Sequence, residues 1–245
     1  MARNGTLSAP LLLAIESATS RLSVALLRGE TLLAEGSPEG TGHHAERILP
    51  LLDAVLEEAG CGVSDPDAFA VSIGPGSFTS LRVGLATVKG LAFGSDRPVI
   101  AVPTLEALAF GTLSSGSPLP RVPILDARRG EAYAAVFDVE DGKLVERVPD
   151  GLFSPAELAA VLPECCLLVG EGAAIFGEEL QTGAGVELPA SLEPDALAPR
   201  AESVARLALR RLRAGEVADP FLAPRYIRRA EAEATRTRLA VEDRI

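Results

Sequence analysis

The stretch that most constrains this fold is an apolar strand, a Gly-Pro-Gly turn and an unusually apolar helix within residues 69–94. Ser77 is suited to cap the helix, because its side chain can accept a hydrogen bond from a free amide of the first turn. The apolar residues of this helix cover more than the ~100° stripe that one core-facing side requires. We therefore expect the helix to pack on two sides.

The outer side of that helix is expected to contact another helix. Small side chains recur there every four residues, which leaves a groove where a second backbone can approach closely. They are Ala86, Gly90 and Gly94. The run is shorter than ~20 residues and contains Arg82 and Lys89, so it is not expected to span a membrane.

Composition narrows the class of protein. The chain has 245 residues, of which 47% are hydrophobic, and this is ample material for a core. A net charge of −11 argues against a sequence-independent nucleic-acid binder, although residues 200–245 are rich in arginine. We recognise no signal peptide and no membrane span, and therefore expect a cytoplasmic protein. The three cysteines match no zinc or redox spacing.

The order of predicted elements indicates an α/β fold. Three strand candidates in residues 11–37 precede a helix at 43–59, and strand, helix, strand and helix follow. This is the plan of one half of the actin-like ATPase (ASKHA, ribonuclease-H-like) fold. We predict an actin-like N-terminal domain at 1–112 and a reduced C-terminal α/β domain at 113–245, too short to be a full copy. An amphipathic helix is expected at 202–214.

Several residues could carry chemistry, and each has a simpler structural explanation. The turn at 74–77 could bind an anion, but a tight turn is the simpler interpretation. The glycines of 169–172 could lie near a nucleotide, or form a strand-to-helix turn. Glu16 ends the first strand, where an actin-like enzyme keeps a carboxylate. The only histidines, His43 and His44, are poorly placed to share one metal ion.

Six segments together resemble the TsaB family, which takes part in bacterial tRNA threonylcarbamoyladenosine synthesis. GPGSFTSLRVG at 74–84 and LDARRGEAY at 125–133 are the most specific of them. The others are LLLAIESATSRLSVALL at 11–27, HHAERILPLLDAVLEEAG at 43–60, AVPTLEALA at 101–109 and APRYIRRAEA at 223–232.

The resemblance implies a non-catalytic scaffold. Such a chain pairs with the catalytic paralogue TsaD, with the ATPase TsaE joining, and forms a homodimer when alone. The pathway transfers a threonylcarbamoyl group to N6 of adenosine 37 in tRNAs that read codons beginning with A, and this chain would meet tRNA only through the complex. The resemblance also implies that the second histidine of the TsaD metal pair is absent, since Arg47 and Ile48 occupy the matching positions. We expect no catalytic, cofactor-binding or metal-binding residue.

The resemblance assigns partner contact to the helices near 43–59 and 78–93. The predicted contact residues are Ile48, Leu52, Val55, Leu81, Leu85, Val88, Lys89 and Ala92. A charge at Leu85 or Val88 is then expected to abolish complex formation and leave the fold intact. Two alternatives remain open: an actin-like nucleotide-binding enzyme (an ATPase or kinase) acting alone, and a metallopeptidase-like protein.

Overall fold

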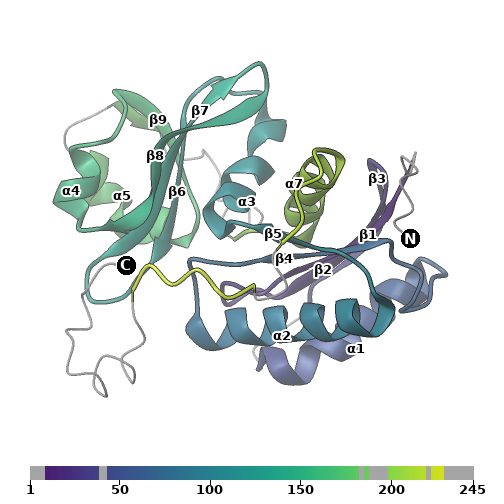
Figure 1. Ribbon diagram of the computed structural model, residues 1–245. Coiled ribbons are helices and arrows are strands. Elements are labelled where there is room, and N and C mark those ends of the chain that lie inside the picture. Colours follow the sequence, from purple (N-terminus) through teal and green to yellow (C-terminus); the bar gives the residue numbers. More distant parts are fainter. Residues whose placement is uncertain (1–8, 39–42, 182–184, 188–197, 219–221, 229–245) are drawn as a thin grey trace.

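The computed structural model describes residues 9–38, 43–181, 185–187, 198–218 and 222–228 (Figure 1). They form two lobes, each built on a five-stranded sheet. The first sheet consists of β1 (Leu11–Glu16), β2 (Ser23–Arg28), β3 (Thr31–Gly36), β4 (Ala68–Ser72) and β5 (Val99–Val102). The helices of this first lobe are α1 (His44–Glu58), α2 (Phe78–Ser95) and α7 (Ala201–Arg213).

The second lobe follows the same plan with shorter helices. Its sheet consists of β6 (Arg121–Asp126), β7 (Ala132–Glu140), β8 (Lys143–Phe153), β9 (Cys165–Val169) and β10 (Gly185–Glu187). Its helices are α4 (Pro155–Ala159) and α5 (Glu171–Gln181). Helix α3 (Thr104–Gly111) and the 3-10 turn η1 (Leu113–Ser115) connect the lobes.

The two sheets have equivalent strand orders, β3-β2-β1-β4-β5 and β8-β7-β6-β9-β10. In each, the first three strands are antiparallel, and the fourth and fifth run parallel to the first. The predicted actin-like fold class is therefore confirmed. The expectation that the second half is not a full copy is wrong for the strands. The repeat was hidden because α4 spans only five residues where α1 spans fifteen.

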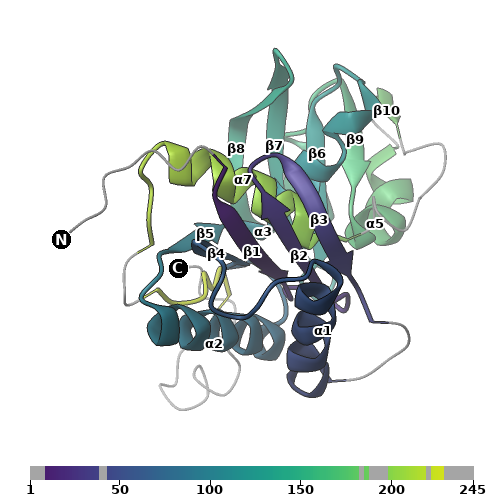
Figure 2. The same ribbon diagram turned by 90° about the vertical axis from the view of Figure 1, so that its right-hand side faces the viewer.

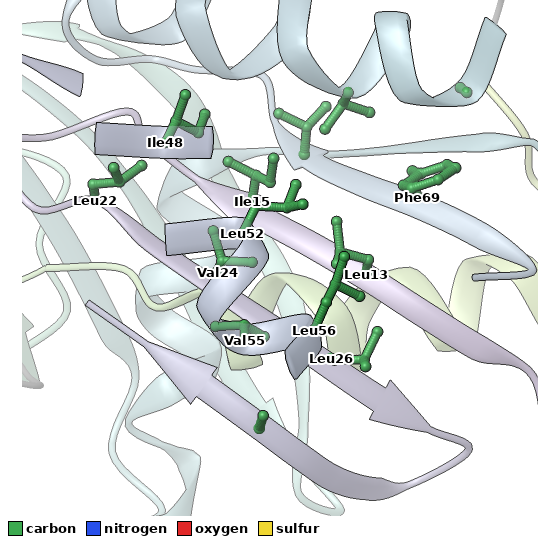
Figure 3. Close-up of a cluster of buried hydrophobic side chains, with 14 of the residues drawn as sticks. Leu13, Ile15, Leu22, Val24, Leu26, Ile48, Leu52, Val55, Leu56 and Phe69 are labelled. Carbon is green, nitrogen blue, oxygen red and sulfur yellow. The ribbon is translucent and has the colours of Figure 1, made fainter. Parts of the chain in front are cut away.

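Helices α1 and α2 cover one face of the first sheet (Figure 2). Apolar side chains of α1 meet the inward-facing residues of β1 and β2, as Figure 3 shows for Leu52, Ile15 and Val24. The opposite face of the sheet packs against α7, whose Val204, Ala205 and Ala208 are fully buried. Because helices cover both faces, β1 and β4 are buried along their whole length, as an apolar strand sequence predicts.

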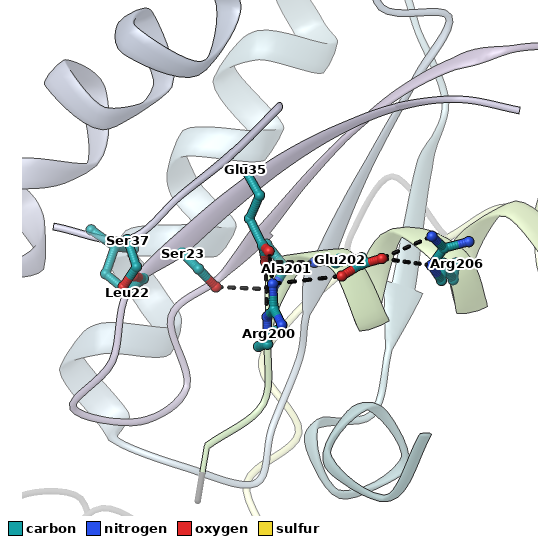
Figure 4. A network of polar contacts seen from close by, with 8 residues as sticks. All are labelled: Leu22, Ser23, Glu35, Ser37, Arg200, Ala201, Glu202 and Arg206. Carbon is teal, nitrogen blue, oxygen red and sulfur yellow. Dashed lines mark hydrogen bonds and ion pairs between the residues drawn. The ribbon is translucent and has the colours of Figure 1, made fainter. Parts of the chain in front are cut away.

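Helix α7 corrects the predicted domain division. The boundary at 112/113 does separate the two sheets, but α7 returns from the C-terminal half and packs on the first sheet. Its start is tied to that sheet by an Arg200–Glu35 ion pair, and the Ala201 amide donates to Ser23 Oγ at 2.9 Å (Figure 4). The predicted helix at 202–214 is confirmed, and it belongs to the first lobe.

The segment at 114–120, between the two lobes, is held by a buried arginine. Arg121, fully buried at the start of β6, donates from its guanidinium to the carbonyl oxygens of Ser117 and Leu119 and to Thr112 Oγ1. Carbonyl oxygens therefore satisfy a cation that would otherwise be costly to bury. Within the described part of the chain, no helix is long and apolar enough to cross a membrane.

Candidate functional site

The turn between β4 and α2 fixes the direction of α2. Gly74 has a φ of 115°, which favours glycine, and a Cβ on Gly76 would lie 2.3 Å from the Ala18 carbonyl oxygen. The Ser77 amide donates to that same oxygen at 2.7 Å, and Ser77 Oγ accepts from the Ser80 amide at 3.5 Å. The predicted cap is thus confirmed. The Ser77 amide is already hydrogen-bonded within the chain, to Ala18.

The inner face of α2 approaches β1 very closely. A Cβ on Gly84 would lie 2.2 Å from Ser17 Oγ, and that hydroxyl donates to the Ser80 carbonyl oxygen at 3.0 Å. Only a residue without a side chain fits at position 84. This close approach brings the rest of the inner face into contact with the sheet.

The predicted contact residues require correction, because seven of the eight are core residues of this chain. None of the seven is more than 7% exposed: Ile48, Leu52, Val55, Leu81, Leu85, Val88 and Ala92. A charge at Leu85 or Val88 would enter the core, so we now expect it to destabilise the fold and not only complex formation. Only Lys89 is exposed, and its Nζ donates to the Leu222 carbonyl oxygen at 3.1 Å.

The outer face of α2 is the exposed one. Phe93 is 93% exposed, and a Cβ added to Gly90 or Gly94 would have no neighbour within 4 Å. Ala86 is exposed one turn earlier, so these residues form one face along the helix. We call Ala86, Gly90, Phe93 and Gly94 the outer α2 face. The small-residue groove expected from the sequence therefore lies on the molecular surface.

A cavity of about 330 Å³ lies between the lobes. The first lobe contributes the loop after β1 and the turn before α2, and the second contributes the β6–β7 turn and the start of α5. The remaining wall is formed by Arg225, Tyr226, Ile227 and Arg228. Sequence reasoning missed this last segment. The sequence links these residues only to the family resemblance, and no local pattern shows that they return to the first lobe.

Glu16 does not face this cavity. The residue is fully buried, and its Oε1 accepts from the Ala18 amide at 2.6 Å. Burial raises the pKa of Glu16 to about 7, and the Ala18 amide and the Ser72 side chain, which favour the ionised form, act in the opposite direction. A carboxyl group buried in this way is not positioned to hold a metal-bound phosphate.

The glycines after β9 serve close packing. Gly170 has a φ of 98°, and a Cβ there would lie 2.4 Å from the Ile124 carbonyl oxygen. A Cβ on Gly172 would lie 2.5 Å from Ile124 Cγ2. Glu171 between them lines the cavity, and its pKa is raised by burial and by the negative charge of Asp126. A strand-to-helix turn, the simpler interpretation of this glycine pair, therefore accounts for both residues.

The two histidines begin α1 rather than converge on one point. His43 is the N-cap residue, and His44 Nε2 lies 3.0 Å from the Thr19 carbonyl oxygen. Among the described residues, no three His, Cys, Asp or Glu side chains gather as metal ligands.

Three of the four arginines of α7 pair with acids, and the fourth, Arg210, lies over the Phe110 ring with its Cζ 4.8 Å from the ring centre. Arg206 pairs with Glu202 at 2.8 Å, Arg211 with Glu106 at 2.5 Å and Arg213 with Glu30 at 2.5 Å. These contacts offset the positive charge that a phosphate-binding face requires.

Comparison with known sequences identifies relatives. The family model described as TsaD, tRNA N6-adenosine threonylcarbamoyltransferase, matches residues 38–236. The chain is 31% identical over 234 residues to the tRNA threonylcarbamoyladenosine biosynthesis protein TsaB of Bacillus subtilis, covering 91% of this chain and 96% of that protein. It is 36% identical over 153 residues to the protein of the same name in Escherichia coli, covering 62% of each.

A solved structure, YeaZ from Pseudomonas aeruginosa, has a similar fold. It superposes with a TM-score of 0.77 at 30% identity and covers 89% of this chain and 99% of the other. The similarity therefore includes most of both lobes.

Proposed function

The chain belongs to the TsaB family of tRNA threonylcarbamoyladenosine biosynthesis proteins, and we propose that it is the non-catalytic partner of the transferase TsaD. In this role it pairs with TsaD, and the ATPase TsaE joins the assembly. In the cytoplasm, the complex modifies N6 of adenosine 37 in tRNAs that read codons beginning with A. This chain contacts tRNA only through the complex.

The observation that carries the proposal is the outer α2 face. An almost fully exposed Phe93 beside open glycines is costly to leave in water, and a stripe of small residues lets a partner helix approach closely. The partner contact thus involves the outer sides of the two predicted helices, because their inner sides form the core. Leu49, 55% exposed on α1, adds apolar surface to this pair.

In the absence of TsaD, the same face pairs with a second copy of the chain. A standard interface buries ~1,600 Å² in total, which α1 and α2 of two chains can supply as a four-helix contact. The homodimer and the TsaD complex then compete for one surface.

A non-catalytic role is supported by the burial of Glu16 and by the scattered histidines. The alternatives of an actin-like ATPase or kinase and of a metallopeptidase are not favoured, since both need polar groups that converge on a substrate.

A matched pair of variants tests the interface. Ala86 on α2 and Ala174 on α5 are both exposed helical alanines, one on the outer α2 face and one on the second lobe. We expect Ala86→Arg to abolish co-elution with TsaD and Ala174→Arg to leave it unchanged, with circular dichroism confirming both folds. Co-elution of Ala86→Arg at the wild-type level would overturn this assignment of the interface.

Reconstitution tests the function itself. Transfer of threonylcarbamoyl to tRNA by TsaD and TsaE is measured with the wild-type chain, with Ala86→Arg and without the chain. We expect full activity only with the wild-type chain. Equal activity in its absence would show that it is not a required partner.

A further inference from the structure

Residues 222–228 follow α7 in the sequence, yet they lie beside α2 at the edge of the cavity between the lobes (yellow segment in Figure 1). The segment contains no helix, and one isolated bridge at Arg228 is its only regular pairing among the described residues. Its position therefore depends on specific contacts, and these involve both lobes.

The first lobe holds the segment by its backbone and by one aromatic ring. The Arg225 amide donates to the Ile73 carbonyl oxygen, directly after β4, at 2.7 Å. Tyr226 stacks on Phe78, the first residue of α2, with ring centroids 4.9 Å apart. Arg82 donates from Nε to Tyr226 Oη at 2.9 Å, and its Cζ lies 3.9 Å from the centre of the Phe78 ring.

A glycine makes this close approach possible. A Cβ on Gly74 would lie 2.7 Å from the Arg225 carbonyl oxygen, so a side chain at position 74 would displace the segment. The turn before α2 is thus shaped for residues 222–228 as well as for the helix.

The second lobe holds the same segment by charge. Arg225 Nη2 pairs with Asp150 Oδ1 of β8 at 2.6 Å, and the Asp150 side chain is only 6% exposed. Arg228 donates to the Ala127 carbonyl oxygen at 2.7 Å and pairs with Glu131, both in the β6–β7 turn. The Arg228 side chain is 9% exposed, so breaking this pair would leave a charge poorly solvated.

We propose that residues 222–228 form a strap that holds the two lobes closed over the cavity between them. The strap is anchored at Ile73 and Phe78 on one lobe and at Asp150 and Glu131 on the other, and it forms one wall of the cavity. Opening of the cavity therefore requires release of the strap. The strap is a property of the single chain and does not depend on which partner binds α2.

Distances between spin labels on the two lobes of the full-length chain test the strap. Cys61, Cys165 and Cys166 are replaced by Ser, Ser and Ala, and labels are attached at Asp53→Cys on α1 and Glu178→Cys on α5. Both label positions are exposed. Double electron–electron resonance then measures the distribution of distances between the two spin labels.

We expect Arg228→Glu to broaden that distribution and shift it to longer distances, because the new carboxylate would face Glu131. The exchanged pair Glu131→Arg with Arg228→Glu should restore the wild-type distribution. Arg213→Glu is the matched control, because Arg213 pairs with Glu30 within the first lobe. It should leave the distance unchanged.

Tyr226→Ala removes the first-lobe anchor without changing charge and is used if Arg228→Glu fails to fold. The proposal is overturned if both variants keep the wild-type distribution. It is also overturned if the exchanged pair is as broad as Arg228→Glu alone, since the ion pair would then not be the cause.

Discussion

The two faces of α2 differ in nearly every respect although they belong to one apolar helix. The inner face is formed by Leu81, Leu85, Val88 and Ala92, all buried. The outer α2 face contains small residues and a phenylalanine that water reaches on almost all sides. Apolar residues on the first face stabilise the chain itself, whereas those on the second are available to a partner. Hydrophobicity alone therefore does not identify an interface.

The largest expected effect is the loss of stability when a charge is placed on the inner face of α2 rather than on the outer α2 face. Val88→Glu should lower the free energy of unfolding by roughly 4 kcal/mol or more, because an ionisable group enters the core. The same change at exposed Phe93 should alter it by less than about 0.5 kcal/mol. Urea denaturation of both variants measures the difference, and similar midpoints would contradict the distinction between the faces.

A second prediction concerns the pH dependence of stability and depends on Glu16, whose carboxyl group is fully buried. Its pKa is about 7 in the folded chain, against 4.5 as the ordinary value. Between these pH values the unfolded state ionises while the folded state keeps its proton, so wild-type stability falls as pH rises and levels off above pH 7.

Glu16→Gln has no carboxyl group to titrate at this position, so its free energy of unfolding should not fall in this way as the pH rises. Relative to wild type, its free energy of unfolding should increase by roughly 2 kcal/mol from pH 5 to pH 8. Glu57→Gln, exposed on α1, controls for the removal of a charge. A Glu16→Gln difference that is the same at both pH values would show that Glu16 is ionised in the fold.

A third prediction concerns the contribution of the outer α2 face to TsaD binding. We expect Phe93→Glu to weaken association with TsaD by about 2 kcal/mol, more than tenfold in Kd, because an exposed aromatic residue is a typical interface anchor. Isothermal titration calorimetry measures this, with Val161→Glu on the exposed surface of the second lobe as control. Equal weakening by both variants would point to a general charge effect instead.

The smallest effects come from two glycines on the same helix. Gly84→Ala should lower the free energy of unfolding by about 1–2 kcal/mol, because the new methyl group clashes with buried Ser17. Gly90→Ala should raise it by about 0.5–1 kcal/mol, since the space is open and alanine favours helix. Thermal melts of the two variants measure the direction of each stability change. Two changes in the same direction would contradict the distinction between the inner and outer faces of α2.

Much of the first lobe could be predicted from local sequence patterns. The strands of the first sheet, the Ser77 cap and the helix at 78–93 follow from apolar periodicity and turn residues, which act over a few positions. Which face of α2 stays exposed could not be predicted, because apolar residues occur on more than one side of the helix and periodicity does not show which side packs on the sheet. The position of Gly84 against Ser17 decides that.

The sequence by itself determined the element order of the first sheet, the fold class and the family, because those depend on local spacing and on motifs such as residues 74–84. Only the tertiary structure decided three other properties: which face of α2 is buried, that the second sheet repeats the first, and that α7 and residues 222–228 return to the first lobe. Each depends on contacts between residues far apart in the chain. The Arg82–Tyr226 hydrogen bond, for example, joins residues 144 positions apart, and no local pattern specifies such a pairing.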